Sequence, residues 1–253
     1  MTPVVCITGA SAGIGEALAL VYAEQGCHLV LGARRLQKLQ ALEGILKEKG
    51  AASVVCLPLD VRSNESVQAW VQAALQKHSH LDILVNNAGL VIGLEPVETG
   101  RVDDWETILD TNVLGVMRVT QALIPVFKKQ NAGHIVMIGS IAGHQPYENG
   151  GAYCASKFGV RALTGVLKHE LNGTGIRVST VDPGMVETEF SVVRFRGDAN
   201  KAKQVYKGLT PLNGRDIAEC VQFMTSRPPH VNIDSIVVMP TAQASVYKVH
   251  RQS

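Results

Sequence analysis

The sequence predicts a single α/β domain with a doubly wound sheet of seven parallel strands flanked by helices. Short runs rich in β-branched apolar residues alternate along the chain with longer stretches of helical pattern. Strands that are apolar throughout and separated by helices are typical of a parallel sheet covered on both faces. No repeat, low-complexity tract or proline-rich linker interrupts the pattern, so we expect one domain over 1–253.

Each element follows from its own local pattern. The expected strands are 3–8, 28–33, 53–60, 81–88, 134–140, 177–183 and 234–240. The expected helices are 13–25, 35–49, 63–78, 103–130, 152–173 and 213–226, and a segment of weaker helical pattern covers 190–208. Ligands of such sheets bind beyond the carboxyl ends of the strands, so functional residues are expected there.

Composition excludes several functional classes. Apolar residues make up 46% of the chain and charged residues 18%, and the net charge of +2 is spread along it, so no nucleic-acid partner is expected. Apolar runs are shorter than the ~20 residues of a membrane span and no basic leader is present, which favours a cytoplasmic protein without a membrane partner. Five cysteines without a CxxC pair predict neither a disulfide framework nor a metal site.

The first strand ends in a glycine-rich turn, TGASAGIG, and a helix follows directly. Glycine allows the tight turn and the close approach of a pyrophosphate, which the free amides of the helix attract. The turn therefore predicts a dinucleotide cradle in a Rossmann-like fold, with contacts from Gly9, Ser11, Gly13, Ile14 and Gly15.

The ends of the next strands indicate which dinucleotide binds. The second strand is followed by Arg34 and Arg35 rather than by an acidic residue, which favours the 2'-phosphate of NADP over the free hydroxyl of NAD. The alternative is that both arginines only open an exposed helix. Asp60 and Val61 are placed to contact the adenine. The fourth strand ends at Asn87, Ala88 and Gly89, where the asparagine side chain can cross-link neighbouring strand ends and Ala88 and Gly89 leave room for a flat ring.

The stretch YCASK begins the helix after the fifth strand and places Tyr153 and Lys157 four residues apart on one face. A phenol has a pKa of about 10, and a neighbouring ammonium is expected to lower that pKa, so that Tyr153 can exchange a proton. Ser140 ends the fifth strand and can hold a carbonyl oxygen. Asn112 falls within the expected helix 103–130, where its amide can hold water.

These motifs together resemble the short-chain dehydrogenase/reductase family over essentially the whole chain. The resemblance implies a homotetramer, reversible hydride transfer with NADP(H) and a catalytic tetrad of Asn112, Ser140, Tyr153 and Lys157. It also implies that Tyr153 and Lys157 contact the cofactor together with residues that follow the sixth strand, which are Pro183, Gly184, Val186 and Thr188.

The segment after the sixth strand predicts the substrate. It carries several basic residues and few bulky apolar ones, which favours a small anionic substrate. Arg194 is the expected anchor, because a guanidinium pairs with both oxygens of a carboxylate or sulfonate. Tyr147 is a second expected contact. The segment resembles the branch of NADP-dependent 3-hydroxy acid (serine or allo-threonine) dehydrogenases and sulfoacetaldehyde reductases.

The C-terminal tail, 241–253, is too short for another domain and is expected to pack on a neighbouring subunit, where Gln243 approaches the partner's active site. Two alternatives to a hydroxy acid dehydrogenase stay open. One is an NADPH reductase of uncharged ketones or aldehydes, which a pocket lined by Leu90, Met185 and Phe190 would favour. The other is a non-catalytic NADP-sensing protein, which would need the cradle but not Tyr153 and Lys157.

Overall fold

Residues 2–252 are described by a computed structural model. They contain one seven-stranded sheet in the order β3-β2-β1-β4-β5-β6-β7, with every neighbouring pair parallel. The strands are β1 Val4–Thr8, β2 His28–Ala33, β3 Ser53–Pro58, β4 Ile83–Asn86, β5 Gly133–Ile138, β6 Ile176–Pro183 and β7 Ser235–Val238. The predicted fold class is confirmed, and the observed strands begin and end within a few residues of the predicted ones.

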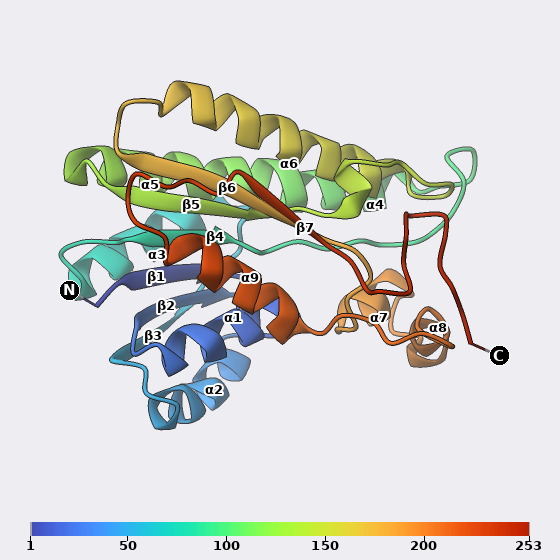
Figure 1. The fold of residues 1–253 in the computed structure, drawn as a ribbon, viewed down its shortest axis with the longest axis horizontal. Helices are drawn as coiled ribbons and strands as arrows, with labels where there is room; N and C mark the ends of the chain where they lie inside the picture. Colours follow the sequence, from blue (N-terminus) through green and yellow to red (C-terminus); the bar gives the residue numbers. More distant parts are fainter. Residues whose placement is uncertain (1, 253) are drawn as a thin grey trace.

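Helices cover both faces of the sheet (Figure 1). One face carries α1 Gly13–Glu24, α2 Leu36–Glu48 and α9 Gly214–Thr225. The other carries α3 Asn64–Lys77, α4 Val102–Leu109, α5 Gly115–Gln130 and α6 Gly151–Glu170. None of the helices in residues 2–252 combines the length and the apolar character needed to cross a membrane.

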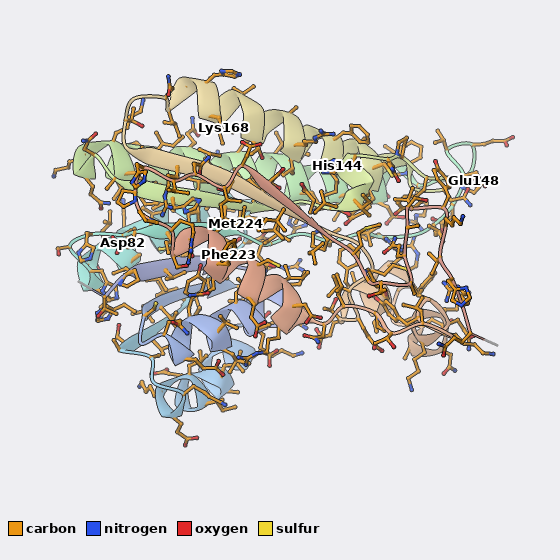
Figure 2. All side chains as sticks on the ribbon, viewed as in Figure 1. Asp82, His144, Glu148, Lys168, Phe223 and Met224 are labelled. Carbon is orange, nitrogen blue, oxygen red and sulfur yellow. The ribbon has the colours of Figure 1, made fainter. Side chains whose placement is uncertain are left out.

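Two hydrophobic layers hold the helices on the sheet. Leu18 and Met224 are fully buried on the α1 and α9 side, whereas Phe127 and Trp70 are buried on the opposite side. Phe223, next to Met224 on α9, faces outward instead, and Figure 2 labels both side chains. Because each core residue comes from a different element, the layers fix the strand ends relative to one another.

The predicted helix 103–130 is interrupted. The chain forms α4, then a π-helical turn over Asp110–Leu114, and then α5. The turn holds Asn112, whose side chain bonds to the backbone of Leu90 rather than lying along a regular helix surface. Such π-helical turns often occur at functional sites.

The predicted segment 190–208 forms two short helices, α7 Phe190–Arg194 and α8 Ala199–Gln204. Between them Arg196 and Gly197 adopt φ angles of 53° and 95°, which reverse the chain. Asp198 then caps α8 by accepting hydrogen bonds from two backbone amides. Both helices lie beyond the carboxyl ends of the strands (Figure 1).

The C-terminal tail folds back onto its own chain. Arg251 donates to the carbonyls of Lys207 and Val205, and the amide of Val246 donates to the side chain of Gln145. The tail therefore connects the end of α8 to the loop before α6. Ser253, the last residue of the predicted tail, lies outside the described residues.

Candidate active site

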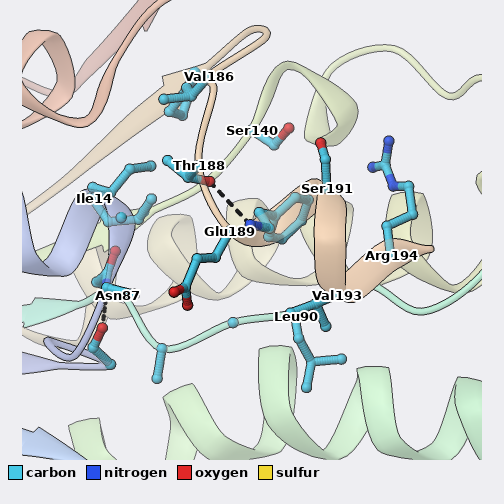
Figure 3. A pocket seen from close by; sticks show the side chains of 18 of the residues that line it. Ile14, Asn87, Leu90, Ser140, Val186, Thr188, Glu189, Ser191, Val193 and Arg194 are labelled. Carbon is cyan, nitrogen blue, oxygen red and sulfur yellow. Dashed lines mark hydrogen bonds between the residues drawn. The ribbon is translucent and has the colours of Figure 1, made fainter. Parts of the chain in front are cut away.

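A cavity of about 530 Å³ opens at the carboxyl ends of the strands. Its wall combines the turn after β1, the ends of β2, β4, β5 and β6, helix α7 and the C-terminal tail. Figure 3 shows side chains of this wall, from Ile14 and Asn87 on one side to Arg194 on the other. The predicted functional residues therefore come together, except for Gly15 and Asn112, which lie behind the wall.

The glycine turn leaves no space for side chains. Gly9 has a φ of 66°, and a Cβ atom there would lie 2.8 Å from the Cα of Ala88. A Cβ on Gly13 would lie 3.2 Å from Cβ of Thr188, and one on Gly15 would lie 2.4 Å from the carbonyl oxygen of Gly9. The turn thus exposes backbone at the start of α1, as a phosphate cradle requires.

The end of β4 is tied to the end of β1. The Asn87 side chain donates to the carbonyls of Thr8 and Gly9 at 2.8 and 3.2 Å, and the Thr8 hydroxyl accepts from the amides of Asn87 and Ala88. Ala88 and Gly89 line the cavity beside this junction. The predicted bracing of neighbouring strand ends is therefore seen for Asn87.

The arginines after β2 differ in their contacts. Arg35 donates to the Ser11 hydroxyl at 3.3 and 3.2 Å and to the Glu189 carboxylate at 2.9 Å. Arg34 also lines the cavity and makes no ion pair within residues 2–252. Lys38, which the sequence reading did not single out, also donates to Glu189. Arg34 and Arg35 form a positive edge of the cavity, which Lys38 extends through its contact with Glu189.

The predicted adenine contacts also reach the cavity. Asp60 and Val61 line it, and Val61 is buried. The Asp60 carboxylate accepts hydrogen bonds from the guanidinium of Arg62, which holds the pKa of Asp60 below its usual value. Asp60 therefore presents a paired, ionised carboxylate at this wall.

Tyr153 and Lys157 lie on the first turns of α6, and each is only 8% exposed. The Lys157 ammonium lies 5.8 Å from the centre of the Tyr153 ring and donates to the carbonyl of Ile138 at 2.8 Å. An ammonium has three donors, so Lys157 keeps donors for a ligand. The predicted pair therefore shares one buried corner of the cavity.

Burial, not the ammonium, governs the phenol in this structure. It raises the pKa of Tyr153 to about 12, while the Ser140 hydroxyl and Arg194 lower that pKa. Burial also lowers the pKa of Lys157 to about 8, and the charge of Asp182 opposes this shift. The expectation that Lys157 lowers the Tyr153 pKa is thus wrong here, because both groups share the apolar surroundings. Tyr153 is a protonated acid at neutral pH.

Ser140 is held by its backbone. Its amide donates to the Asp182 carboxylate at 3.2 Å, and its hydroxyl accepts from the amide of Ala142 at 3.1 Å. Asp182 is 3% exposed and also bonds to Thr180 and His144. The sequence reading missed Asp182, although a carboxylate at the end of a buried strand is an unusual residue that could have been noticed.

Asn112 acts on the wall from behind. Its side-chain oxygen accepts from the Leu90 amide at 2.8 Å, and its side-chain nitrogen donates to the Leu90 carbonyl and to the Ser156 hydroxyl. The amide thereby ties the loop after β4 to α6. This side chain braces the site, and the predicted role of Asn112 in holding water stays a prediction.

Arg194 is the charged group at the far end of the cavity. It donates to the Tyr147 hydroxyl at 3.3 Å, and its guanidinium lies 5.8 Å from the centre of the Tyr153 ring and 5.6 Å from that of Phe190. Its Nε atom is buried and has no hydrogen-bond partner among the described residues. Within 2–252 no carboxylate neutralises Arg194. The group is therefore prepared to receive an anion.

Two side chains from distant segments complete this end. Gln243 is buried and accepts from the Met185 amide at 2.8 Å, so it lines the cavity of its own chain. The expected approach of Gln243 to a partner's active site stays a prediction. Tyr206 donates to the Val186 carbonyl and bonds to Ser191 at 2.7 Å. The sequence reading missed Tyr206, because no motif marks a lone tyrosine after α8.

A family model for short chain dehydrogenases matches residues 3–198. The chain belongs to this family. The prediction of the family is confirmed, and so is the resemblance to its hydroxy acid dehydrogenase and sulfoacetaldehyde reductase branch. The chain is therefore an oxidoreductase of the short-chain type, and its TGASAGIG turn, NNAG strand end and YCASK helix each contribute residues to the cavity wall.

Several relatives match over nearly the full length. An NADP-dependent 3-hydroxy acid dehydrogenase YdfG of Salmonella typhi is 41% identical, with 98% of this chain and 99% of the relative covered. Sulfoacetaldehyde reductase 2 of Chromohalobacter salexigens is 40% identical, with 99% and 100% covered. The closed form of a serine dehydrogenase with NADP+ superposes with a TM-score of 0.92 at 39% identity, covering 98% of this chain and 100% of that one.

Proposed function

We propose that the protein is an NADP(H)-dependent oxidoreductase that interconverts a short hydroxy acid, carboxylate or sulfonate, and its carbonyl form. The carrying observation is Arg194, a half-buried guanidinium that lies beside the ring of Tyr153 and has no carboxylate partner among residues 2–252. An acid group held by Arg194 would place a nearby carbon and oxygen beside Tyr153. The predicted acid anchor and the predicted proton donor therefore share one end of the cavity.

The residues present fit NADP. The glycine turn offers free backbone for the pyrophosphate, Ser11, Arg34 and Arg35 offer hydrogen-bond donors for the 2'-phosphate, and the buried Lys157 keeps free donors for a ribose. When bound, the nicotinamide accepts or supplies the hydride. Asn87, Pro183, Gly184, Val186 and Thr188 line the same cavity.

The chain itself handles the proton and the oxygen. Tyr153, protonated at neutral pH, donates its proton to the substrate oxygen in reduction and accepts one in oxidation. The Ser140 hydroxyl holds the same oxygen as charge develops on it. Lys157 supplies a positive charge behind the phenol, and Asp182 keeps that lysine protonated more readily than burial alone would allow.

Steady-state kinetics with NADP test the substrate class. The panel is L-serine, L-allo-threonine, 3-hydroxypropionate, isethionate and sulfoacetaldehyde, each with wild type, Arg194→Ala and Arg196→Ala. Arg196 is a matched control because it is exposed, pairs with Asp104 and lies outside the cavity wall. Loss of a charged hydrogen bond in Arg194→Ala should raise KM by roughly 10- to 100-fold for the acid that is turned over. Arg196→Ala should leave KM unchanged.

A second candidate function is the reduction of uncharged ketones. Leu90, Met185 and Phe190 line the cavity, which gives it an apolar surface beside Tyr153. The two candidates differ in their response to a neutral substrate. A ketoester and its free acid should differ strongly in kcat/KM if Arg194 binds the acid group, with the acid preferred. Equal use of both, unaffected by Arg194→Ala, would instead favour the ketone reductase.

We also propose a homotetramer in the cytoplasm. Large apolar side chains are exposed on helices α5 and α6, at Met117 and Phe158, and again on strand β7 at Val237 and on α9 at Phe223. Two separate apolar surfaces suit a tetramer built from two kinds of two-fold contact. Light scattering should give four times the mass of 27.1 kDa, and Phe223→Glu should reduce that mass. A monomeric wild type would contradict the proposal.

A further inference from the structure

Glu189 joins the two ends of the active site. It follows Thr188 and directly precedes helix α7, the helix that carries Arg194. Its carboxylate accepts a hydrogen bond from Arg35 and one from Lys38, both at 2.9 Å. Figure 3 shows Glu189 and Arg194 extending from the same segment in different directions. One short segment thus places the negative charge of Glu189 at the cofactor edge and the positive charge of Arg194 at the substrate end.

The cations that Glu189 holds belong to the edge where the proposed function places the 2'-phosphate. Arg35 already gives Nε and Nη2 to the Ser11 hydroxyl, and it gives Nη1 to Glu189. Lys38 gives its ammonium to the other carboxylate oxygen. The Glu189 carboxylate therefore occupies donors that a phosphate at this edge would use.

A phosphate and Glu189 cannot share these donors without cost. Lys38 and Arg35 hold the pKa of Glu189 below its usual value, so the carboxylate is negative at neutral pH. A phosphate monoester carries close to two negative charges at that pH. Two anions that meet on one pair of cations repel each other, and the more highly charged anion has the stronger attraction to the cations.

Helix α7 would respond to a loss of this contact because it is only five residues long. Its other hydrogen bonds to distant segments within residues 2–252 come from the substrate end: the Arg194 carbonyl accepts from the Gly93 amide at 2.9 Å, the Arg194 guanidinium donates to the Tyr147 hydroxyl, and Ser191 bonds to Tyr206. Glu189 is the contact that links the start of α7 to α2. Without it, α7 is held only from the substrate side.

Building on the proposed function, we propose that Glu189 competes with the 2'-phosphate of NADP for Arg35 and Lys38. Binding of the phosphate then breaks the contact between Glu189 and these cations, which frees the start of α7 and changes the position of Arg194 on it. Glu189 is then a specificity-determining residue that makes the substrate end respond to NADP but not to NAD. NADP then changes the affinity of Arg194 for the acid. By thermodynamic linkage, an acid bound at Arg194 changes the affinity for NADP by that same factor.

Two small probes test the competition without the rest of the cofactor. Adenosine 2',5'-bisphosphate carries the 2'-phosphate, whereas ADP does not, and neither has a nicotinamide that could touch α7. Calorimetry should show that Glu189→Gln binds the bisphosphate roughly three- to tenfold tighter than wild type, with ADP binding unchanged. Glu219→Gln is the matched control, because Glu219 is also exposed and paired with an arginine, but on α9. It should bind both probes like wild type.

Hydrogen exchange of a peptide from α7 supplies the second readout. In wild type, the bisphosphate should speed exchange over residues 190–197, and ADP should not. In Glu189→Gln the exchange of this peptide should already be fast and should not respond to the bisphosphate. This readout does not depend on turnover of any substrate.

The outcomes distinguish a failure of the Glu189 competition from a failure of the proposed NADP site on which it rests. If wild type prefers the bisphosphate over ADP but Glu189→Gln binds it no tighter, or α7 does not respond, the competition is refuted and the NADP assignment stands. If wild type binds both probes equally, the assignment of the 2'-phosphate to this edge fails, and the competition fails with it.

Discussion

The cofactor end and the substrate end of the cavity are built in different ways. At the cofactor end, backbone atoms form the surface: Gly9 and Gly13 have positive φ angles, and the Asn87 side chain is used to bond the backbone of β1. At the substrate end, side chains bridge separate segments: Arg194 donates to the Tyr147 side chain, and the Gln243 side chain accepts from the Met185 amide. Backbone surfaces tolerate almost no change, whereas side-chain surfaces can be replaced one residue at a time. The first end thus fixes the cofactor, and the second can vary with the substrate.

The largest effect is expected where the two ends meet, at Tyr153. Tyr153→Phe removes the proton donor and keeps the ring packed against Phe190, whose centroid is 5.6 Å away. We expect kcat to fall by roughly 10³-fold, with NADPH binding unchanged in a fluorescence titration. An NADP-sensing protein would behave normally with this substitution. Retained turnover would therefore show that the buried phenol is not the acid.

The next effect tests the backbone surface of the cofactor end. Gly9→Ala places a Cβ atom 2.8 Å from the Ala88 backbone and strains a φ of 66°. We expect a loss of about 2–3 kcal/mol in the free energy of unfolding and at least a tenfold loss of NADP affinity. Gly165→Ala on α6 is the control, because no atom lies within 4 Å of its new Cβ. It should be neutral or stabilising by up to ~1 kcal/mol. Normal behaviour of Gly9→Ala would contradict the comparison.

The sequence was informative about the cofactor end for the same physical reason. Gly9, Arg35 and Asn87 lie at or close to the ends of predicted strands, and in a parallel sheet the strand ends meet at one edge. Their positions therefore depend only on local pattern and topology, and both were predicted. The family's YCASK motif likewise placed Tyr153 and Lys157 together.

The substrate end was harder to predict because its contacts join segments without a shared pattern. Arg194 and Tyr147 are 47 residues apart, and Gln243 and Met185 are 58 apart. Arg194 could be proposed from its charge, but neither Tyr206 nor the contact of Glu189 with Arg35 and Lys38 could be. The pKa of Tyr153 was misjudged because sequence spacing shows which charges are near and does not show how much water is removed.

A third prediction concerns the cost of burying Lys157. The folded-state pKa of about 8 lies below the value of 10.5 expected for an exposed lysine, so folding disfavours the charged form. This cost is fully present below pH 8 and disappears as the pH rises from 8 to 10.5. Lys157→Met should therefore be inactive yet more stable at pH 7, by up to about 3 kcal/mol. Denaturant unfolding at pH 7, 9 and 10.5 should show that the gain in free energy of unfolding over wild type shrinks as the pH rises. A gain that is the same at all three pH values would mean that packing, not the buried charge, causes it.

The smallest expected effect tests the side-chain surface of the substrate end. Tyr206→Phe keeps the ring but removes a hydroxyl that donates to the Val186 carbonyl at 2.8 Å and bonds to Ser191 at 2.7 Å. These bonds hold α7 against the end of β6, so their loss should raise the KM of the acid substrate about three- to fivefold, at a cost of about 1 kcal/mol in stability. The kcat should stay the same, and any change in the affinity for NADP should be smaller than the change in KM, because α7 reaches the cofactor end only through Glu189 at its start. A change in NADP affinity as large as the change in KM would show that the Tyr206 bonds hold the cofactor end as well as the substrate end, and a change in neither would show that α7 is held without Tyr206.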